Sequence, residues 1–291
     1  LFSKKLKRLK ITEIYVEGNE KILNNFGIAV VGSRNSSREG EHITEEFVKQ
    51  FCKKNINIIS GLAKGIDSIA HQTCINNGGI TIAVLGSGFN HVYPKENKPL
   101  YEKIIKSGGA IISEYPPETE PDSLHFPKRN RIVSALSDGI LMIEGKHRSG
   151  TTITAEYGIK QKKPVFCLPH SISNSYGTGP NSIIKKGGIL VTKAQDIIKY
   201  YENQNIEFIE KENKKKYDNE ILKYVPRLIY KYEDYKMTGS IYHEINLIQF
   251  VKEHINEIKG EFACFVLPCQ ARAIRSILER SNVNSILIGL T

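Results

Sequence analysis

The sequence predicts an α/β fold in which a parallel sheet is covered by helices on both faces and is followed by a smaller C-terminal α/β piece. Two observations support this prediction. Short apolar runs alternate with segments of helical periodicity about six times between residues 27 and 192, which is typical of parallel sheets. Glycine or serine–glycine follows most of the apolar runs, as expected where strands end in loops.

The individual elements follow from these two patterns. The run GIAVVGSR (27–34) is continuously apolar, as in strands that are buried on both faces. The next segment, 36–55, has apolar residues on one helical face and begins with two serines that can cap its first turn. The remaining predictions, in chain order, are strand 56–63, helix 63–79, strand 80–88, helix 98–109, strand 110–116, helix 127–138, strand 139–145, helix 151–163, strand 164–170, helix 179–188 and strand 189–192.

The C-terminal third differs in composition. Residues 200–220 are polar and highly charged, which predicts a linker or a solvated helix. Further along, the pattern predicts a helix at 245–260, a strand at 262–268, a helix at 270–281 and a strand at 285–290. We therefore expect a domain at 1–199, a linker at 200–220 and a C-terminal region of undetermined function, which could be a truncated domain, at 221–291.

Composition limits the possible classes of protein. The chain has 291 residues, 40% of them hydrophobic and 25% charged, which is typical of a globular protein. No apolar run reaches the roughly 18 residues of a membrane span, so none is expected. The first residues, LFSKKLKRLK, lack the apolar core of a signal peptide, so we expect a cytoplasmic protein. The chain opens at Leu1 and ends at IGLT, as a fragment would.

Positive charge is concentrated in the first part of the chain. Residues 1–200 contain 28 Lys and Arg against 18 Asp and Glu, whereas residues 201–291 contain 13 of each. This asymmetry favours a polyanion as partner of the first part. The alternative is a surface of solvated lysines with no specific partner.

Cysteine usage gives no indication of a metal or redox site. The five cysteines include no CxxC pair and no His/Cys cluster at zinc spacing, so no metal is expected. Cys52, Cys74 and Cys167 lie in apolar or helical settings, which predicts buried, reduced thiols.

Four loops follow the predicted strands and carry small residues together with cations. Ligands of open parallel sheets bind at the carboxyl ends of the strands, so we expect these loops to form one phosphate-binding edge. Taken singly, each loop could equally be a tight turn or a solvated surface. The loops are Gly32-Ser33-Arg34, the segment 60–67 with Gly61 and Lys64, the segment 126–131 with Phe126, Lys128, Arg129 and Arg131, and the segment 148–152 with Ser149, Gly150 and Thr151.

Known cofactor and catalytic patterns are missing from the sequence. Neither GxGxxG nor GxxxxGK[ST] occurs, so a hydride-transfer enzyme and a P-loop NTPase are not favoured. Four carboxylates, Asp67, Glu114, Glu144 and Glu156, flank the predicted strands, but the sequence does not order them into a catalytic set. The histidines show no pairing at metal-ligand spacing and are interpreted as packing or surface residues.

Seven motifs, in order, resemble the DNA-processing protein A family (DprA, also called Smf). The motifs are AVVGSR, IISGLAKGIDSIAH, TIAVLGSGFNHVYPKEN, IISEYPPETEP, FPKRNRIVSALSDGILMIEG, RSGTTITAEYG and GPNSIIKKGG. The resemblance covers about residues 10–198, two-thirds of the chain. It implies an extended Rossmann-like fold and a non-enzymatic homodimer without cofactor. Such a protein binds single-stranded DNA and helps to load the RecA recombinase during natural transformation and recombination.

The resemblance also assigns the site residues. It implies that Gly32, Ser33 and Arg34 contact phosphate and that Ser149, Gly150 and Thr151 close the pocket. Gly61 and Lys64 lie in the matching Ser-Gly-Leu-Ala loop, and Phe126, Lys128, Arg129 and Arg131 lie in the matching Phe-Pro-x-Arg-Asn-Arg stretch. Cations along a backbone and an aromatic ring under a base are the usual means of holding a single strand.

The chain departs from the family at both ends. The helical N-terminal domain that is common in the family is missing or truncated, and the C-terminal part does not resemble its winged-helix domain. Residues 261–290 instead resemble the coenzyme F420 hydrogenase/dehydrogenase beta-subunit family, through Pro268, Cys269 and Gln270 alone. Cys269 is interpreted as a packing residue or a redox residue.

Two other functions fit parts of the same pattern. SGTTITAE is similar to a segment of nucleoside-monophosphate phosphoribohydrolases, in which Glu156 would act on a ribose and Arg129 would hold a phosphate. The Pro-Gly-Gly that precedes this segment in those enzymes is absent. A nucleotide-binding module without chemistry is the third possibility.

Overall fold

The computed structural model describes residues 3–9, 11, 13–208, 261–266 and 284–289. The chain divides into two compact units, Leu1–Asn213 and Lys214–Thr291, and each is described by itself.

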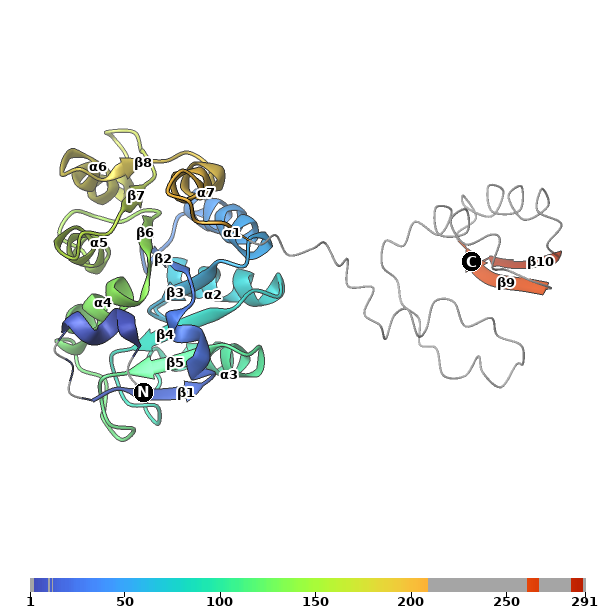
Figure 1. Ribbon diagram of the computed structural model, residues 1–291, viewed down its shortest axis with the longest axis horizontal. Helices are drawn as coiled ribbons and strands as arrows, with labels where there is room; N and C mark the ends of the chain where they lie inside the picture. The colour runs from blue at the N-terminus through green and yellow to red at the C-terminus, as the bar shows by residue number, and fades with distance from the viewer. Residues whose placement is uncertain (1–2, 10, 12, 209–260, 267–283, 290–291) are drawn as a thin grey trace. The chain divides into compact units, whose positions relative to one another are not determined.

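The first unit is built on one eight-stranded sheet with the order β1-β5-β4-β3-β2-β6-β7-β8 (Figure 1). Every neighbouring pair is parallel except β1 and β5. The chain order runs outward from β2 in one direction to β5 and then from β6 in the other, so the order reverses between β2 and β6. The strands are β1 (Tyr15–Gly18), β2 (Gly27–Val31), β3 (Asn57–Ser60), β4 (Thr81–Leu85), β5 (Ala110–Ser113), β6 (Gly139–Met142), β7 (Val165–Cys167) and β8 (Ile189–Leu190).

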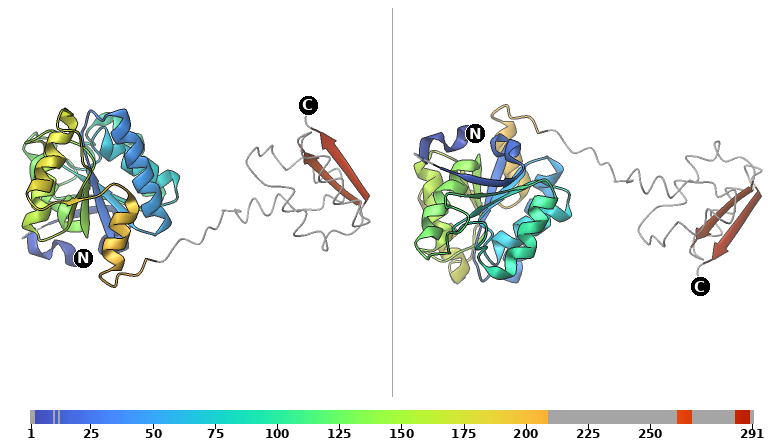
Figure 2. Two further views of the ribbon diagram at one scale, coloured as in Figure 1. Left: turned by 90° about the horizontal axis from the view of Figure 1, so that it is seen from above. Right: turned by 90° about the horizontal axis from the view of Figure 1, so that it is seen from below.

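Helices cover both faces of the sheet, as Figures 1 and 2 show. The α-helices are α1 (Arg38–Lys53), α2 (Ile66–Asn76), α3 (Lys98–Lys106), α4 (His125–Leu136), α5 (Gly150–Lys160), α6 (Thr178–Lys185) and α7 (Ala194–Glu202). Short 3-10 helices are η1 (Lys4–Leu9), η2 (Glu20–Asn24), η3 (Lys95–Asn97) and η4 (Ser175–Gly177).

Alternation along the strands explains the two-layer core. In β2, Ile28 and Val30 pack against α1, α2 and α7, whereas Ala29 and Val31 join a cluster with α4, α5 and α6. Successive side chains of a strand point to opposite faces, so an all-apolar strand serves two cores at once. All five residues of β2 are buried, which accounts for its continuous apolar run.

The predicted fold class is confirmed, and the predicted helices and strands of residues 27–192 are all present, most of them shorter than predicted. Helix α4 has the predicted length but begins two residues earlier, and α5 and α6 each begin one residue earlier. The sequence analysis missed β1, a four-residue antiparallel edge strand that is only partly buried and therefore has a weak pattern. It also missed α7. That helix continues to Glu202 and buries Tyr201, so regular structure reaches into the segment predicted as a linker.

In the second unit, β9 (Glu261–Val266) and β10 (Asn284–Gly289) form a parallel pair, and both strands were predicted. The predicted helices at 245–260 and 270–281, most of the 200–220 segment and the triplet Pro268-Cys269-Gln270 lie outside the described residues. Among the residues that are described, no helix has the length and apolar character to cross a membrane.

Candidate functional site

A cavity of about 750 Å³ opens at the carboxyl ends of the strands. Its walls come from the loops that follow β2, β3 and β6 and from the first turns of α4 and α5. Because the strand order reverses between β2 and β6, the loops after these two strands diverge and leave space between them. The topology therefore places the cavity where ligands of open α/β sheets bind.

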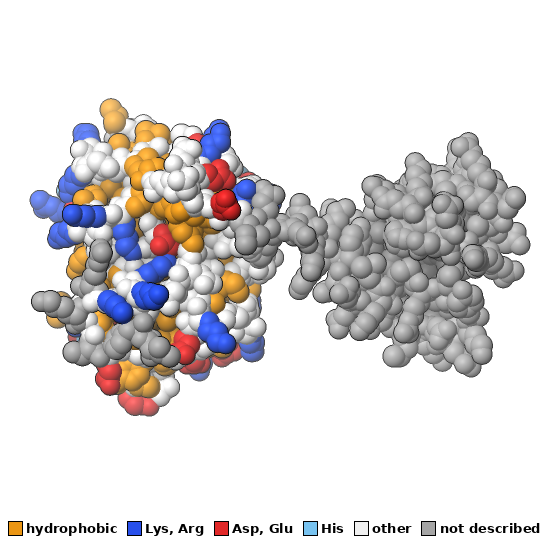
Figure 3. All heavy atoms as spheres, in the orientation of Figure 1, with side chains coloured by type: hydrophobic (Ala, Val, Ile, Leu, Met, Phe, Trp, Pro, Cys, Tyr) orange, Lys and Arg blue, Asp and Glu red, His pale blue; other side chains and the backbone are white. Residues whose placement is uncertain are grey.

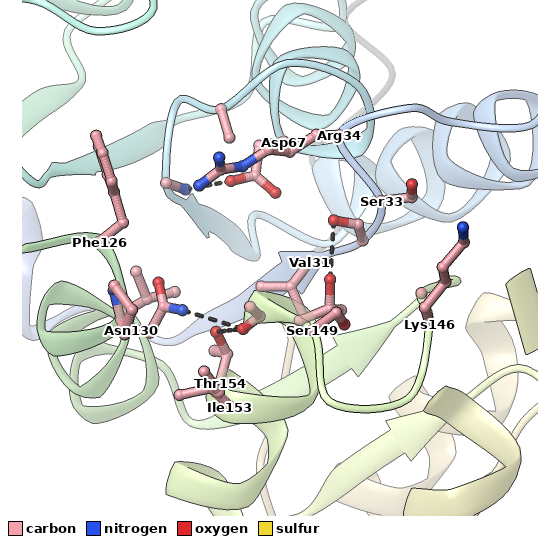
Figure 4. A pocket seen from close by; sticks show the side chains of 18 of the residues that line it. Val31, Ser33, Arg34, Asp67, Phe126, Asn130, Lys146, Ser149, Ile153 and Thr154 are labelled. Carbon is pink, nitrogen blue, oxygen red and sulfur yellow. Dashed lines mark hydrogen bonds between the residues drawn. The ribbon is translucent and has the colours of Figure 1, made fainter. Parts of the chain in front are cut away.

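Nine of the twelve residues predicted from the sequence line this cavity. They are Gly32, Ser33, Arg34, Gly61, Phe126, Arg129, Ser149, Gly150 and Thr151. Figure 4 shows how Ser33 and Arg34 approach from one side while Ser149 and Lys146 approach from the loop opposite. A hydrogen bond joins the two sides, since Thr151 Oγ1 donates to the carbonyl of Gly32 over 3.0 Å. The predicted convergence of the four loops is observed.

Packing requires glycine at one of two cavity positions, Gly61, and not at the other, Gly150. A Cβ at Gly61 would lie 2.5 Å from Arg129 Nη2 and 2.8 Å from Asp67 Oδ2, so a side chain is excluded by packing. At Gly150, the first residue of α5, the nearest atom to a Cβ would be Asn130 Nδ2 at 3.9 Å. The space beside Gly150 is open, so packing does not require glycine there. The bare backbone instead leaves room for a ligand beside the first turn of α5.

Two exposed cations stand at the cavity without an ion-pair partner among the residues that the structure describes. Arg34 follows β2, and its guanidinium lies 5.5 Å from the centroid of the Phe126 ring. Lys146 follows β6 and was not singled out by the sequence analysis. The only signal for Lys146 was its place among the basic residues of the loop after a predicted strand. Both side chains are available to an anion.

Arg129 occupies a different position from Arg34. Its side chain is 4% exposed, and Nη1 donates to the carbonyl of Gly61 over 2.7 Å and to that of Val84. Asp67 accepts a hydrogen bond from the backbone N–H of Gly61 over 3.0 Å. Burial lowers the pKa of Arg129 to about 10, an effect that the charge of Asp67 opposes. Arg129 thus joins the ends of β3 and β4 to α4 while it contributes positive charge to the cavity wall.

The other three predicted residues do not line the cavity. Lys64 donates to Glu96 over 2.9 Å. Lys128 lies 3.8 Å from a carboxylate oxygen of Glu114, and Arg131 pairs with the same carboxylate. For these three residues, as for the nine that line the cavity, contact with phosphate stays a prediction.

The carboxylates near the cavity are engaged in structural contacts. Glu144 is buried and accepts hydrogen bonds from the backbone N–H (2.9 Å) and hydroxyl (2.6 Å) of Ser37, the N-cap residue of α1. Asp67 is buried, which raises its pKa, while the charge of Arg129 acts in the opposite direction. Glu156 pairs with Lys186 over 2.7 Å and lines a separate cavity of about 200 Å³. Glu156 and Arg129 therefore do not share one cavity, as a phosphoribohydrolase arrangement would require.

Basic side chains gather on the side of the first unit that carries α4 and α5 (Figure 3). Within the described part of the chain, no three His, Cys, Asp or Glu side chains are grouped so that they could hold a metal ion.

Comparison with known proteins gives one family. The family model for DNA recombination-mediator protein A matches residues 2–202. The chain is 40% identical over 195 residues to protein Smf of Escherichia coli K12, covering 67% of this chain and 51% of that protein. It is 39% identical over 198 residues to DNA processing protein DprA of Bacillus subtilis, covering 68% of this chain and 66% of that protein.

Solved structures of the same family also match this chain. The X-ray structure of DprA from Streptococcus pneumoniae matches with a TM-score of 0.60 at 40% identity, covering 64% of this chain and 65% of that one. A DprA from Helicobacter pylori, whose structure is described as showing a single-stranded DNA binding mode, matches with a TM-score of 0.64 at 28% identity, covering 70% and 94%. The chain spans between half and two-thirds of the length of the first two curated relatives.

Proposed function

Because this chain belongs to the DNA recombination-mediator protein A (DprA/Smf) family, we propose that its first unit binds single-stranded DNA in the cavity between β2 and β6. The observation that supports this proposal most directly is the convergence of four loops, far apart in sequence, on one cavity that carries Arg34 and Lys146. A cavity of about 750 Å³ has room for more than a single phosphate group.

In this proposal some wall residues contact the phosphates of the DNA and one contacts a base. Arg34 and Lys146 attract phosphates from opposite sides of the cavity. The first N–H groups of α5, beside Gly150, donate to a phosphate oxygen at the positive end of the helix dipole. Phe126 supplies an aromatic wall for a base. None of these contacts reads base edges, so binding is independent of sequence.

The same proposal describes a binding protein and not an enzyme. Of the four candidate carboxylates only Asp67 lines the cavity, and it accepts a hydrogen bond from the backbone N–H of Gly61. The other three, Glu114, Glu144 and Glu156, lie outside the cavity wall and have hydrogen-bond or ion-pair partners. The alternative of phosphoribohydrolase chemistry loses support, since Glu156 lines a different cavity. Incubation with nucleoside monophosphates should release no free base.

Partners and location extend the proposal. Loading of the RecA recombinase, action in natural transformation, formation of a homodimer and a cytoplasmic location are what the family implies for this chain. They are proposed for the whole protein together with DNA binding.

Fluorescence anisotropy with a labelled oligonucleotide tests the binding. Affinity should fall as salt rises, because each neutralised phosphate of a single strand contributes about −0.7 to the slope of log affinity against log salt. Arg34→Ala should weaken binding to all sequences about equally, and the matched control Arg38→Ala, an exposed arginine that does not line the cavity, should not. Affinity that is independent of salt would overturn the proposal.

A further inference from the structure

The cavity has a second aromatic ring that the sequence analysis did not single out. Tyr93 lies in the segment between β4 and α3 and lines the cavity together with Phe126 of α4. The two ring centroids are 5.3 Å apart, and the ring planes are tilted by 39°. Tyr93 and Phe126 thus form one continuous aromatic wall from two distant parts of the chain.

The two rings differ in how much of their surface is already in contact with protein. Phe126 is half-buried, and a Cβ at Gly86 would lie 2.8 Å from its Cδ1, so the backbone of Gly86 packs against this ring. The guanidinium of Arg34 lies 5.5 Å from the Phe126 centroid. Neighbours therefore surround Phe126 on several sides. Tyr93 is 46% exposed although it is a large aromatic side chain.

The surroundings of Tyr93 also suit a nucleotide. Arg34 is an exposed cation of the same cavity, and its guanidinium lies 5.5 Å from the centroid of the Phe126 ring that Tyr93 contacts. A base stacked on Tyr93 would therefore lie in a cavity that also offers a cation to its phosphate. An exposed tyrosine with no such surroundings would need no explanation.

On the basis of the proposed single-stranded DNA-binding function, we infer that Tyr93 is the exposed part of the aromatic wall, on which a nucleobase stacks, and that Phe126 completes this wall and positions the Tyr93 ring. Every base has a π-face, so a stacking platform retains bases without selecting among them.

Substitution at position 93 separates stacking from other contributions. Loss of one stacked base corresponds to a decrease in affinity of about 5- to 150-fold, which we expect for Tyr93→Leu. Tyr93→Phe keeps the ring and should bind like the unaltered protein. Tyr157→Leu is the matched control, because Tyr157 is a half-buried tyrosine that lines neither cavity.

A second measurement uses the composition of the chain. The sequence contains no tryptophan, so Tyr93→Trp introduces a single reporter at the proposed platform. We expect an unlabelled oligothymidylate to quench its fluorescence, with the same midpoint as in the anisotropy titration. Tyr157→Trp should show no such quenching. Tyr93→Leu also removes the ring contact with Phe126, so the quenching experiment, in which a ring is retained, decides the inference independently.

The outcomes distinguish the two proposals. If the unaltered chain does not bind the oligonucleotide, the proposed function fails. If it binds, but Tyr93→Leu binds equally well or the tryptophan at position 93 is not quenched, DNA binding stands and the assignment of Tyr93 is overturned.

Discussion

Arg129 offers a test of how the cavity is held together. Arg129→Met replaces the buried guanidinium by an apolar side chain of similar length. The carbonyls of Gly61 and Val84 then lose their donor, and the carboxylate of Asp67 loses the nearest opposing charge. Leaving a buried hydrogen-bonding group without its partner costs about 1–3 kcal/mol. We expect the free energy of unfolding at neutral pH to fall by about this amount.

The loss should depend on pH. Burial already raises the pKa of Asp67 above its ordinary value of 3.8, and removal of Arg129 raises it further. A carboxyl whose pKa is raised by folding destabilises the protein increasingly as pH rises from the unfolded to the folded pKa. The cost of Arg129→Met should therefore be smaller near pH 4 than at neutral pH. Asp67→Asn in the Arg129→Met background should remove this pH dependence.

Urea denaturation followed by circular dichroism measures both effects. The double variant should be more stable at neutral pH than additivity of the two single variants predicts, because the residues interact. A cost below about 1 kcal/mol at neutral pH, with no dependence on pH, would refute the structural role of Arg129.

Three further predictions rest on single contacts. Gly150→Gln should abolish oligonucleotide binding in the anisotropy assay, because its side chain would occupy the open space beside the first turn of α5, and the unfolding temperature should not change. A decrease in the unfolding temperature together with the loss of binding would contradict this prediction. His71 is fully buried, and burial lowers its pKa to about 3, so only the unfolded chain takes up the proton as pH falls below 6.5. Unfolding free energy should therefore drop by about 1.4 kcal/mol per pH unit below that value, and His71→Leu should lack this part of the drop in urea titrations. Burial raises the pKa of Cys167 to about 12, so mass spectrometry should find this thiol unmodified by iodoacetamide in the folded protein at neutral pH.

The sequence predicts most of the first unit because its strands are buried on both faces. Such strands are continuous apolar runs, and in the helices between them apolar residues recur with the 3.6-residue period of the helix, so both patterns are strong. The strand β1 is an exception, since an edge strand of four residues with two exposed positions has neither pattern. The last residues of helix α7, from position 200, were assigned to the linker because a polar and charged segment continues directly after residue 202.

The site could be predicted only in part. Glycine-rich loops after parallel strands must meet at one edge of the sheet, and this rule predicts the cavity residues in the loops after β2 and β3 and at the start of α5. The rule does not predict in which direction a long cationic side chain points. Lys64 turns towards Glu96, which lies 32 residues away in sequence, and this partner could not be known beforehand. Tyr93 gave no signal because its relation to Phe126 exists only after folding.

The bond between Thr151 Oγ1 and the carbonyl of Gly32 joins residues 119 positions apart. During synthesis, the ribosome must therefore release more than half of the first unit before the two halves of the cavity can meet. Domains fold as units once their sequence has emerged. A nascent chain that ends before α5 lacks one wall of the cavity, so the proposed affinity for DNA would arise only late in synthesis.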